Sequence, residues 1–94
     1  MQFWQAVPFT HPDEMLELVP VIEEAGFEGI LLADHVFAPE SYDSRYPYSA
    51  SGKMGIAPEV NFIDPLIALA TIAAHTKRLR PGTGVNILPQ SNPL

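Results

Sequence analysis

The run from Gly29 to Ala33, Gly-Ile-Leu-Leu-Ala, constrains the fold more than any other part of the chain. Its residues are continuously apolar instead of alternating with polar ones. This predicts a strand that is buried on both faces, as in a parallel sheet. Asp34 and His35 follow directly, and the chain then enters a loop that contains proline. A buried strand that ends in an acid and an imidazole raises the question of what those two side chains do.

A helix is predicted between this strand and a first, short apolar strand at Phe3–Phe9. From Met15 to Ala25 the apolar residues fall at helical spacing and form one stripe. Thr10 is the expected N-terminal cap, and Gly26 is a good stop signal. Because proline removes a backbone donor, Pro20 is expected to kink or split this helix.

A second helix and a third strand are predicted after a long loop, residues 36–62, which shows no periodic pattern. Asp64-Pro65 is a strong helix start. The following residues, Leu66–Ala74, are apolar nearly all round, so we expect this helix to be well buried. The third strand is expected within Gly82–Leu88, and Pro81 is expected to make it begin late. Asn92-Pro93 suggests the start of another helix.

The predicted order is strand, helix, strand, long loop, helix, strand, which implies right-handed parallel units. No glycine-rich fingerprint follows the first strand, and this argues against a dinucleotide-binding Rossmann fold. Each unit takes roughly 30 residues, as in a barrel of about 250 residues. We therefore expect an α/β chain in which residues 1–94 form a single partial domain. It would be the N-terminal fragment of a TIM (β/α)8 barrel, with about three parallel strand–helix units.

Composition excludes several classes of function. Hydrophobic residues make up 47% of the chain, enough for a packed core. The net charge is −6 with only five Lys and Arg, so neither nucleic acid nor an anionic membrane is an expected partner. The absence of cysteine excludes disulfides, thiolate zinc sites and a cysteine nucleophile. No histidine spacing suggests a metal site. Without a signal peptide or a membrane-length apolar run, the expected location is cytoplasmic.

Four segments, taken together, resemble a known family. In chain order they are AGFEGILLADHVF, SRYPYSASG, FIDPLIALATIAAHTKRLRPGTGV and ILPQSNPL. They resemble the luciferase-like flavin-dependent oxidoreductases, and their spacing is similar to the branch that uses a deazaflavin, coenzyme F420. The resemblance spans essentially the whole chain but only about the first third of such a barrel enzyme. The chain departs from the family pattern at Trp4, where a small residue is usual, at Pro81, and at Ser91.

The resemblance implies an oxidoreductase or monooxygenase. Hydride would pass to or from a bound flavin (FMN) or coenzyme F420 and an organic small-molecule substrate. With FMN the expected reaction is oxygenation of the substrate, and with F420 plain hydride transfer. The full-length protein is expected to be a homodimer.

The resemblance places His35 and Asp34 at the active-site mouth, where the carboxyl ends of the strands meet. It implies a catalytic role for His35, since an imidazole can give or take a proton as hydride moves. Asp34 is expected to support it by orientation or hydrogen bonding. The alternative is that both are strand-end residues that bond to loop backbone.

The resemblance also implies a cofactor contact at Thr83, Gly84 and Val85. In the family the corresponding turn often contains a non-proline cis peptide bond, which here would be Gly84–Val85, and forms a bulge against the flavin ring. A small residue suits such a close approach, and Gly84 supplies one. The alternative is an ordinary glycine turn that leaves a strand.

Three aromatic residues are candidates for binding the substrate: Phe9, Tyr46 and Tyr48. Phe9 ends the first strand, and both tyrosines lie in the long loop, which is a candidate substrate wall. The alternative is a loop that packs on its own aromatic side chains.

Two other functions remain open on the sequence alone. One is a metal-dependent TIM-barrel hydrolase that uses Asp34 and His35 with ligands from later strands. The other is a non-catalytic truncated fragment that binds a partner along its open sheet edges. In either enzyme case, the isolated 94 residues are expected to show no turnover.

Overall fold

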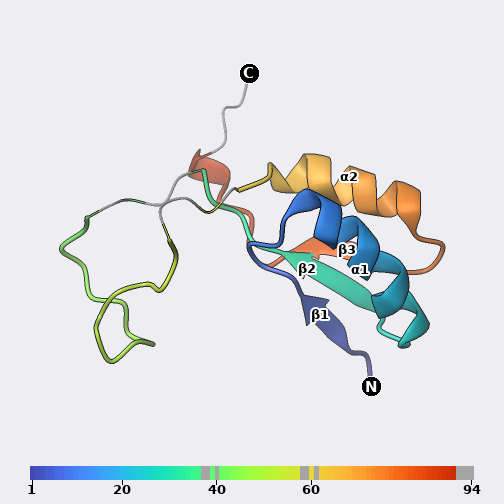
Figure 1. The fold of residues 1–94 in the computed structure, drawn as a ribbon, viewed down its shortest axis with the longest axis horizontal. Coiled ribbons are helices and arrows are strands. Elements are labelled where there is room, and N and C mark those ends of the chain that lie inside the picture. The colour runs from blue at the N-terminus through green and yellow to red at the C-terminus, as the bar shows by residue number, and fades with distance from the viewer. Residues whose placement is uncertain (37–38, 40, 58–59, 61, 91–94) are drawn as a thin grey trace.

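The computed structural model describes residues 1–36, 39, 41–57, 60 and 62–90. Its elements, in chain order, are β1 (Trp4–Ala6), α1 (Pro12–Glu24), β2 (Gly29–Leu32), α2 (Pro65–His75), β3 (Arg80–Thr83) and a short 3-10 helix, η1 (Leu88–Gln90). The predicted order of strands and helices is therefore confirmed (Figure 1). The helix expected from Asn92-Pro93 lies outside the described residues.

The three strands form one parallel sheet in the order β1-β2-β3. Gly29 of β2 lies opposite Trp4 of β1 on one side and Arg80 of β3 on the other. The continuous apolar run thus becomes the central strand. Its Ile30 and Leu32 are buried in the core, but Leu31, on the opposite face, is only half-buried, so the predicted burial on both faces is met on one face. The first strand is shorter than the expected Phe3–Phe9, because only residues 4–6 pair with β2.

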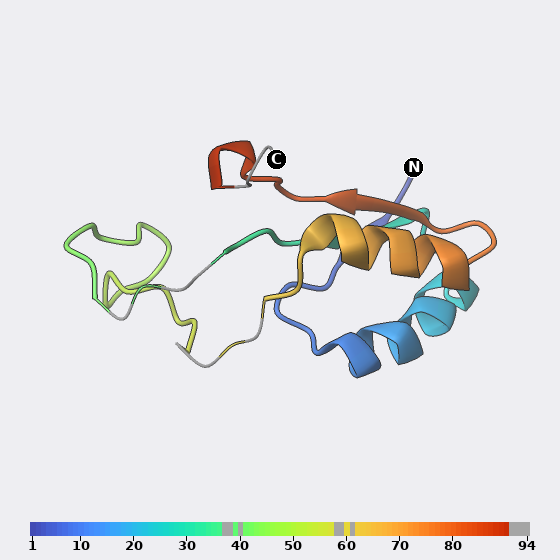
Figure 2. The ribbon, with the colours of Figure 1, turned by 90° about the horizontal axis from the view of Figure 1, so that it is seen from above.

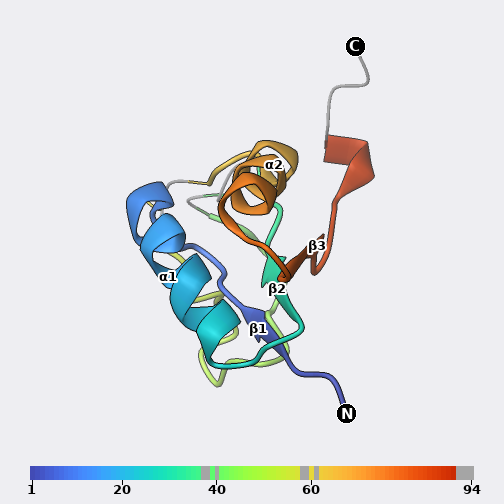
Figure 3. The same cartoon turned by 90° about the vertical axis from the view of Figure 1, so that its right-hand side faces the viewer.

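Both helices cover the same face of the sheet, as the views in Figure 2 and Figure 3 show. Sequential strand order with both crossover helices on one side is the arrangement of consecutive barrel units, whereas a doubly wound sheet has helices on both faces. The α/β class with parallel strands is confirmed. A closed (β/α)8 barrel remains a prediction, since three strands alone do not close.

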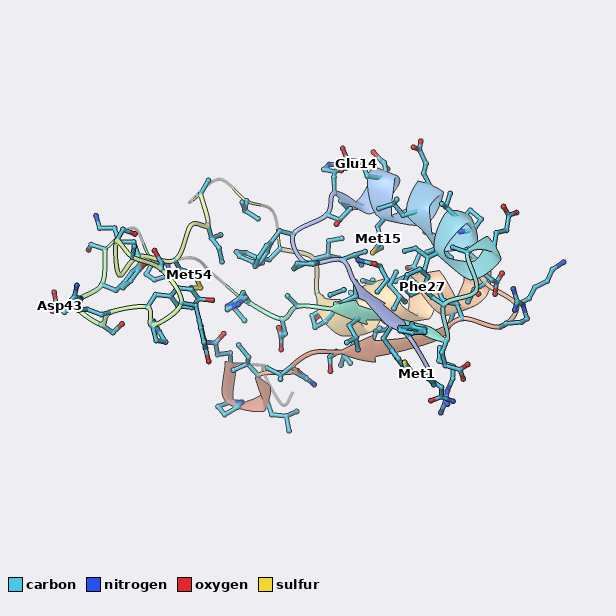
Figure 4. All side chains as sticks on the ribbon, turned by 90° about the horizontal axis from the view of Figure 1, so that it is seen from below. Met1, Glu14, Met15, Phe27, Asp43 and Met54 are labelled. Carbon is cyan, nitrogen blue, oxygen red and sulfur yellow. The ribbon has the colours of Figure 1, made fainter. Side chains whose placement is uncertain are left out.

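The core lies between this covered face and the two helices. Met15, Val19 and Ile22 of α1 are buried against β2 and α2. Phe27, which follows α1, is partly buried and packs against the same core; Figure 4 labels it and Met15. The remaining residues of the core cluster come from the three strands, their flanks and α2: Val7, Ile30, Leu32, Ala68, Ile72 and Leu79.

Helix α1 starts one residue later than predicted and runs without a break. Its N-terminal cap is His11, whose Nδ1 accepts the Asp13 amide at 3.4 Å, so the expectation of a Thr10 cap is wrong. Pro20 lies inside the helix with an exposed side chain and does not split it. The predicted stop is confirmed: Gly26 has a φ of 86°, and the Phe27 amide donates to the Ile22 carbonyl, which closes a Schellman motif.

Helix α2 begins as predicted and is buried less than predicted. Oδ1 of Asp64 accepts the Leu66 and Ile67 amides at 2.9 and 3.0 Å, a complete N-terminal cap. The expectation of burial all round is wrong, because only the face with Ala68 and Ile72 packs on the core, while Leu66 and Ile67 are 60% and 66% exposed. No helix in the described ranges has both the length and the apolarity to cross a membrane.

Strand β3 begins at Arg80, so Pro81 does not delay it and that expectation is wrong. The Arg80 amide donates to the carbonyl of Glu28, directly before β2, and the Gly84 amide donates to the carbonyl of Leu32, the last residue of β2. In an extended chain, donors that face one neighbour alternate along the strand. Pro81 falls between these donors and faces away from β2, where its missing N–H interrupts no bond to that strand.

One carboxylate ties the end of α1 to the connection between α2 and β3. Glu23 accepts the Thr76 hydroxyl and the amides of Arg78 and Leu79, the latter two at 2.6 and 3.0 Å. The Thr76 hydroxyl and then the Arg78 amide lower the pKa of the Glu23 carboxyl from 4.5 to about 2. This contact joins residues that are more than 50 positions apart.

Candidate active site

A cleft of about 510 Å³ opens where β2 and β3 end. Asp34 and His35 reach it from the end of β2, and Asn86 and Gln90 reach it from the segment after β3. Asp64, the cap of α2, and four apolar residues complete the lining: Val36, Phe62, Pro65 and Leu66. The cleft thus occupies the carboxyl ends of parallel strands, the edge at which α/β folds place ligands.

Asp34 is only 5% exposed, and its Oδ2 accepts the Ile87 amide at 2.6 Å. This bond joins the end of β2 to the segment after β3 and holds the two sides of the cleft together. A contact of this kind, from a strand-end side chain to loop backbone, is what the structural alternative predicted for Asp34. It also fits a supporting role beside His35, which is the next residue.

His35 is half-buried and lines the cleft. Two aromatic rings lie beside its imidazole, with ring centroids 6.2 Å away for Phe9 and 5.3 Å away for Phe62. Phe62 lies just before the cap of α2, at the other end of the connection that His35 begins, while Phe9 comes from the connection between β1 and α1. His35 thus lines a cleft at the strand ends, and its catalytic role stays a prediction.

Thr83, Gly84 and Val85 leave β3 beside the end of β2. The Gly84 amide donates to the Leu32 carbonyl at 2.8 Å, which continues the pairing of the strands by one residue. The peptide bond Gly84–Val85 is cis, as the resemblance implied. Gly84 is exposed, and Val85 is 67% exposed, so this turn presents backbone and an apolar side chain outward.

Phe9 lies at a different surface from the cleft lining. Its ring borders a small apolar cavity of about 30 Å³, whose wall includes Val7, Met15 and Phe62. The ring is 41% exposed and packs edge-on against Phe62, with centroids 5.5 Å apart. Phe62 borders both spaces and thus separates the cleft from the cavity.

Tyr46 and Tyr48 are not brought to the cleft. They contact each other, with ring centroids 5.6 Å apart, in a loop that extends away from the sheet (Figure 1). Figure 4 shows Asp43 and Met54 of this loop at the far end of the molecule from α1. Tyr46 borders a separate pocket of about 330 Å³ with Tyr42, Arg45 and Met54.

This loop is held by its own contacts. The Tyr46 amide donates to the Gly52 carbonyl at 2.7 Å, and the Met54 amide donates to the Tyr42 hydroxyl. The geometry therefore fits the alternative of a loop packed on its own aromatic side chains.

Sequence reasoning did not name seven residues of the cleft as site residues: Val36, Phe62, Asp64, Pro65, Leu66, Asn86 and Gln90. Phe62 could have been found, because an aromatic residue two positions before a capped helix lies at the carboxyl end of the sheet. Asn86 and Gln90 carry no such signal, since their placement depends on how the chain turns after β3. Within the described ranges, no three His, Asp or Glu side chains gather closely enough to hold a metal ion.

Comparison with known proteins gives one family match. The model of a family described as luciferase-like monooxygenase matches residues 2–94. Similar curated proteins include an uncharacterized protein of Mycobacterium bovis and uncharacterized proteins of two Mycobacterium tuberculosis strains. Each is 30% identical over 80 residues, which are 85% of this chain and 28% of the relative. The chain thus spans less than a third of the length of these relatives. No solved structure gives a significant match.

Proposed function

The chain belongs to the luciferase-like monooxygenase family, and on that premise we propose that the complete protein is an oxidoreductase working at the cleft beside His35. The cofactor, FMN or coenzyme F420, supplies the hydride chemistry with an organic small-molecule substrate. The observation that carries the proposal is that His35 lines a cleft at the end of β2, while the Gly84–Val85 turn leaves the adjacent parallel strand directly before Asn86, which lines the same cleft. A cytoplasmic homodimer is part of the same proposal.

The residues present fit the flat ring of such a cofactor. The ring needs apolar surface with a few polar groups, and this edge offers Val36, Phe62 and the exposed Val85 beside His35 and Asn86. A Cβ added at Gly84 would meet only Leu31, at 3.6 Å, so the outer side of this turn is not blocked by described residues.

The same edge does not fit a phosphate group. The charged and titratable side chains among the cleft's lining residues are Asp34, His35 and Asp64, and no Lys or Arg is among them. A phosphate needs cations or free backbone amides, and the Asp64 carboxylate already takes the first amides of α2. We therefore assign the ring to this segment and the phosphate site to residues outside the cleft described here.

His35 is proposed to hold or move the proton that accompanies hydride transfer. An imidazole does this near neutral pH, and it must reach the reacting atoms within hydrogen-bond distance. Asp34 is a positioning residue in this scheme: its bond to the Ile87 amide keeps the two strand ends in register. Thr83, Gly84 and Val85 supply the surface on which the ring rests.

Fluorescence titration of the protein with FMN, and separately with coenzyme F420, tests the proposal. We expect tight binding of one of the two. The substitution Val85→Asp should weaken that binding at least about tenfold, a loss of about 1.4 kcal/mol, because it places a charge against the ring. Val85 is 67% exposed, so the fold should tolerate the change.

Two matched controls locate the effect. Val21→Asp places the same charge at a 58% exposed valine on the outer side of α1 and should leave binding unchanged. His35→Ala should weaken binding or abolish turnover, whereas His75→Ala, at the exposed end of α2, should do neither. Failure of both cofactors to bind would refute the proposal. If the cofactor bound to Val85→Asp and to His35→Ala with the affinity of the wild type, the proposed location of the site would be refuted.

A further inference from the structure

Three rings from two connections meet beside the cleft, two of them from opposite ends of the same connection. Phe9 follows β1, His35 follows β2, and Phe62 precedes α2. Their centroids are 5.3, 5.5 and 6.2 Å apart, and each distance lies within the range at which aromatic side chains attract one another. The Phe9 and Phe62 rings meet edge to face, at 81°, and the imidazole is tilted against both. The three rings form a closed triangle in which His35 and Phe62 line the cleft and Phe9 does not.

The backbone of Phe9 is unusual. Its φ is 60°, in the left-handed region, and it is the only residue other than glycine with a positive φ in the described part of the chain. A bulky side chain seldom adopts this conformation, because its Cβ crowds the backbone. Phe9 follows Pro8 in a turn, which matches the type II pattern of proline second and positive φ third. Glycine or asparagine is the residue favoured at that third position.

A residue held in a disfavoured conformation requires surrounding contacts that fix it. The aromatic contacts of the Phe9 ring are with His35 and Phe62, and the side chain, which also borders the small cavity beside Val7 and Met15, is 41% exposed. Burial of Phe9 in the core therefore does not explain why a large ring occupies a turn position that suits glycine. Contact with the imidazole does explain it.

We propose that Phe9 and Phe62 are positioning residues that hold the His35 imidazole in the cleft, and that the left-handed turn at Phe9 serves to bring its ring there. Asp34 is fixed by a hydrogen bond to backbone, and its neighbour His35 is fixed by two rings. Only the catalytic consequence of this arrangement rests on the proposed function. The positioning itself is a property of the folded chain.

Proton–carbon NMR of the His35 ring, in protein with labelled histidine, tests the proposal without any cofactor. Aromatic neighbours displace the ring C–H signals of His35 through their ring currents. Phe9→Asn keeps a residue that tolerates the left-handed turn but removes the ring, and Phe62→Leu keeps apolar bulk but removes the aromatic face. Each should move the His35 signals toward their positions in an unfolded chain. Phe9→Tyr, which keeps the ring, should leave them close to wild type.

Phe27→Leu is the matched control. Phe27 packs against the core before β2 begins, whereas His35 follows the other end of that strand. This variant should lower the melting temperature and leave the His35 signals in place, so a general loss of stability is separated from a loss of positioning. Unchanged His35 signals in both Phe9→Asn and Phe62→Leu would overturn the proposal. An equal displacement in Phe27→Leu would overturn it as well.

A kinetic readout separates this inference from the proposed function. In the active enzyme, Phe9→Asn should lower kcat by up to about 100-fold, the scale expected for a misplacement of about 1 Å, with cofactor affinity retained. Displaced NMR signals together with unchanged kcat would show that the rings position His35 but that His35 is not used in the chemistry. That result would refute the proposed function of His35 and leave the positioning intact.

Discussion

At the scale of single residues, Gly29 shows why one position of the central strand must lack a side chain. A Cβ built there would lie 2.3 Å from the Trp4 ring and 2.6 Å from the Arg80 carbonyl oxygen. Trp4 stands where the family resemblance implies a small residue, and the glycine opposite it in the sheet leaves room for the larger ring. The departure at Trp4 is thus accommodated by packing on the neighbouring strand.

Gly29→Ala should destabilise the fold by about 1–3 kcal/mol, the usual cost of overpacking a filled site. Gly55→Ala is the matched control, because a Cβ at Gly55 would meet nothing within 4 Å. Urea denaturation of both variants measures the difference. If Gly29→Ala were as stable as Gly55→Ala, the close packing of Trp4 on β2 would be incorrect.

The residues of the site were predictable to different degrees. Asp34 and His35 could be located because they directly follow an unmistakable buried strand, and Gly84–Val85 because its motif resembles that of the family. Tyr46 and Tyr48 could not, since a long loop without periodicity gives no sign of whether it folds over the sheet or on itself. The contacts in the loop show that these two tyrosines pack with each other.

At the scale of elements, the sequence signals predicted correctly where the helices α1 and α2 end and begin, but they did not predict how the elements pack on one another. Asp64-Pro65 begins α2, and Gly26 ends α1, as predicted, because caps depend on neighbouring residues only. The extent to which α2 is buried could not be read from its composition. An apolar helix is buried only where other elements cover it, and here one face packs on α1 and the sheet.

Glu23 joins the end of α1 to the connection between α2 and β3, and its effect on stability depends on pH. Its pKa is lowered to about 2 in the folded chain from an ordinary value of 4.5. The carboxylate therefore stabilises the fold fully above about pH 4.5, and this contribution is lost as the pH falls from there toward 2. Glu23→Gln should be less stable than wild type at neutral pH, with the gap between the two closing across that window.

Urea denaturation over a pH series measures this gap. The other carboxylates are common to both proteins, so the difference isolates Glu23. Glu24→Gln removes an exposed neighbouring charge, and the difference in its free energy of unfolding from wild type should not change over the pH series. A constant gap between Glu23→Gln and wild type down to pH 2 would show that the contacts to Thr76 and Arg78 do not depend on the charge.

At the scale of the whole molecule, three parallel strands and two helices on one face follow from the sequence pattern. The apolar central run requires a strand on each side, and right-handed crossovers then place both helices on the same face. The closed barrel and the dimer remain predictions, because both depend on residues beyond the three strands. The absence of turnover in the isolated 94 residues is a prediction of the same kind.

The central claim is that cofactor binds at the carboxyl ends of β2 and β3. Hydrogen exchange of the protein with and without the cofactor that binds it, read by mass spectrometry, tests this most directly. Binding should slow exchange in peptides that cover residues 33–36 and 83–88, and leave residues 42–54 and the far end of the sheet around Glu28 unchanged. Protection confined to the 42–54 loop or to the far end, with residues 33–36 and 83–88 unaffected, would contradict the account.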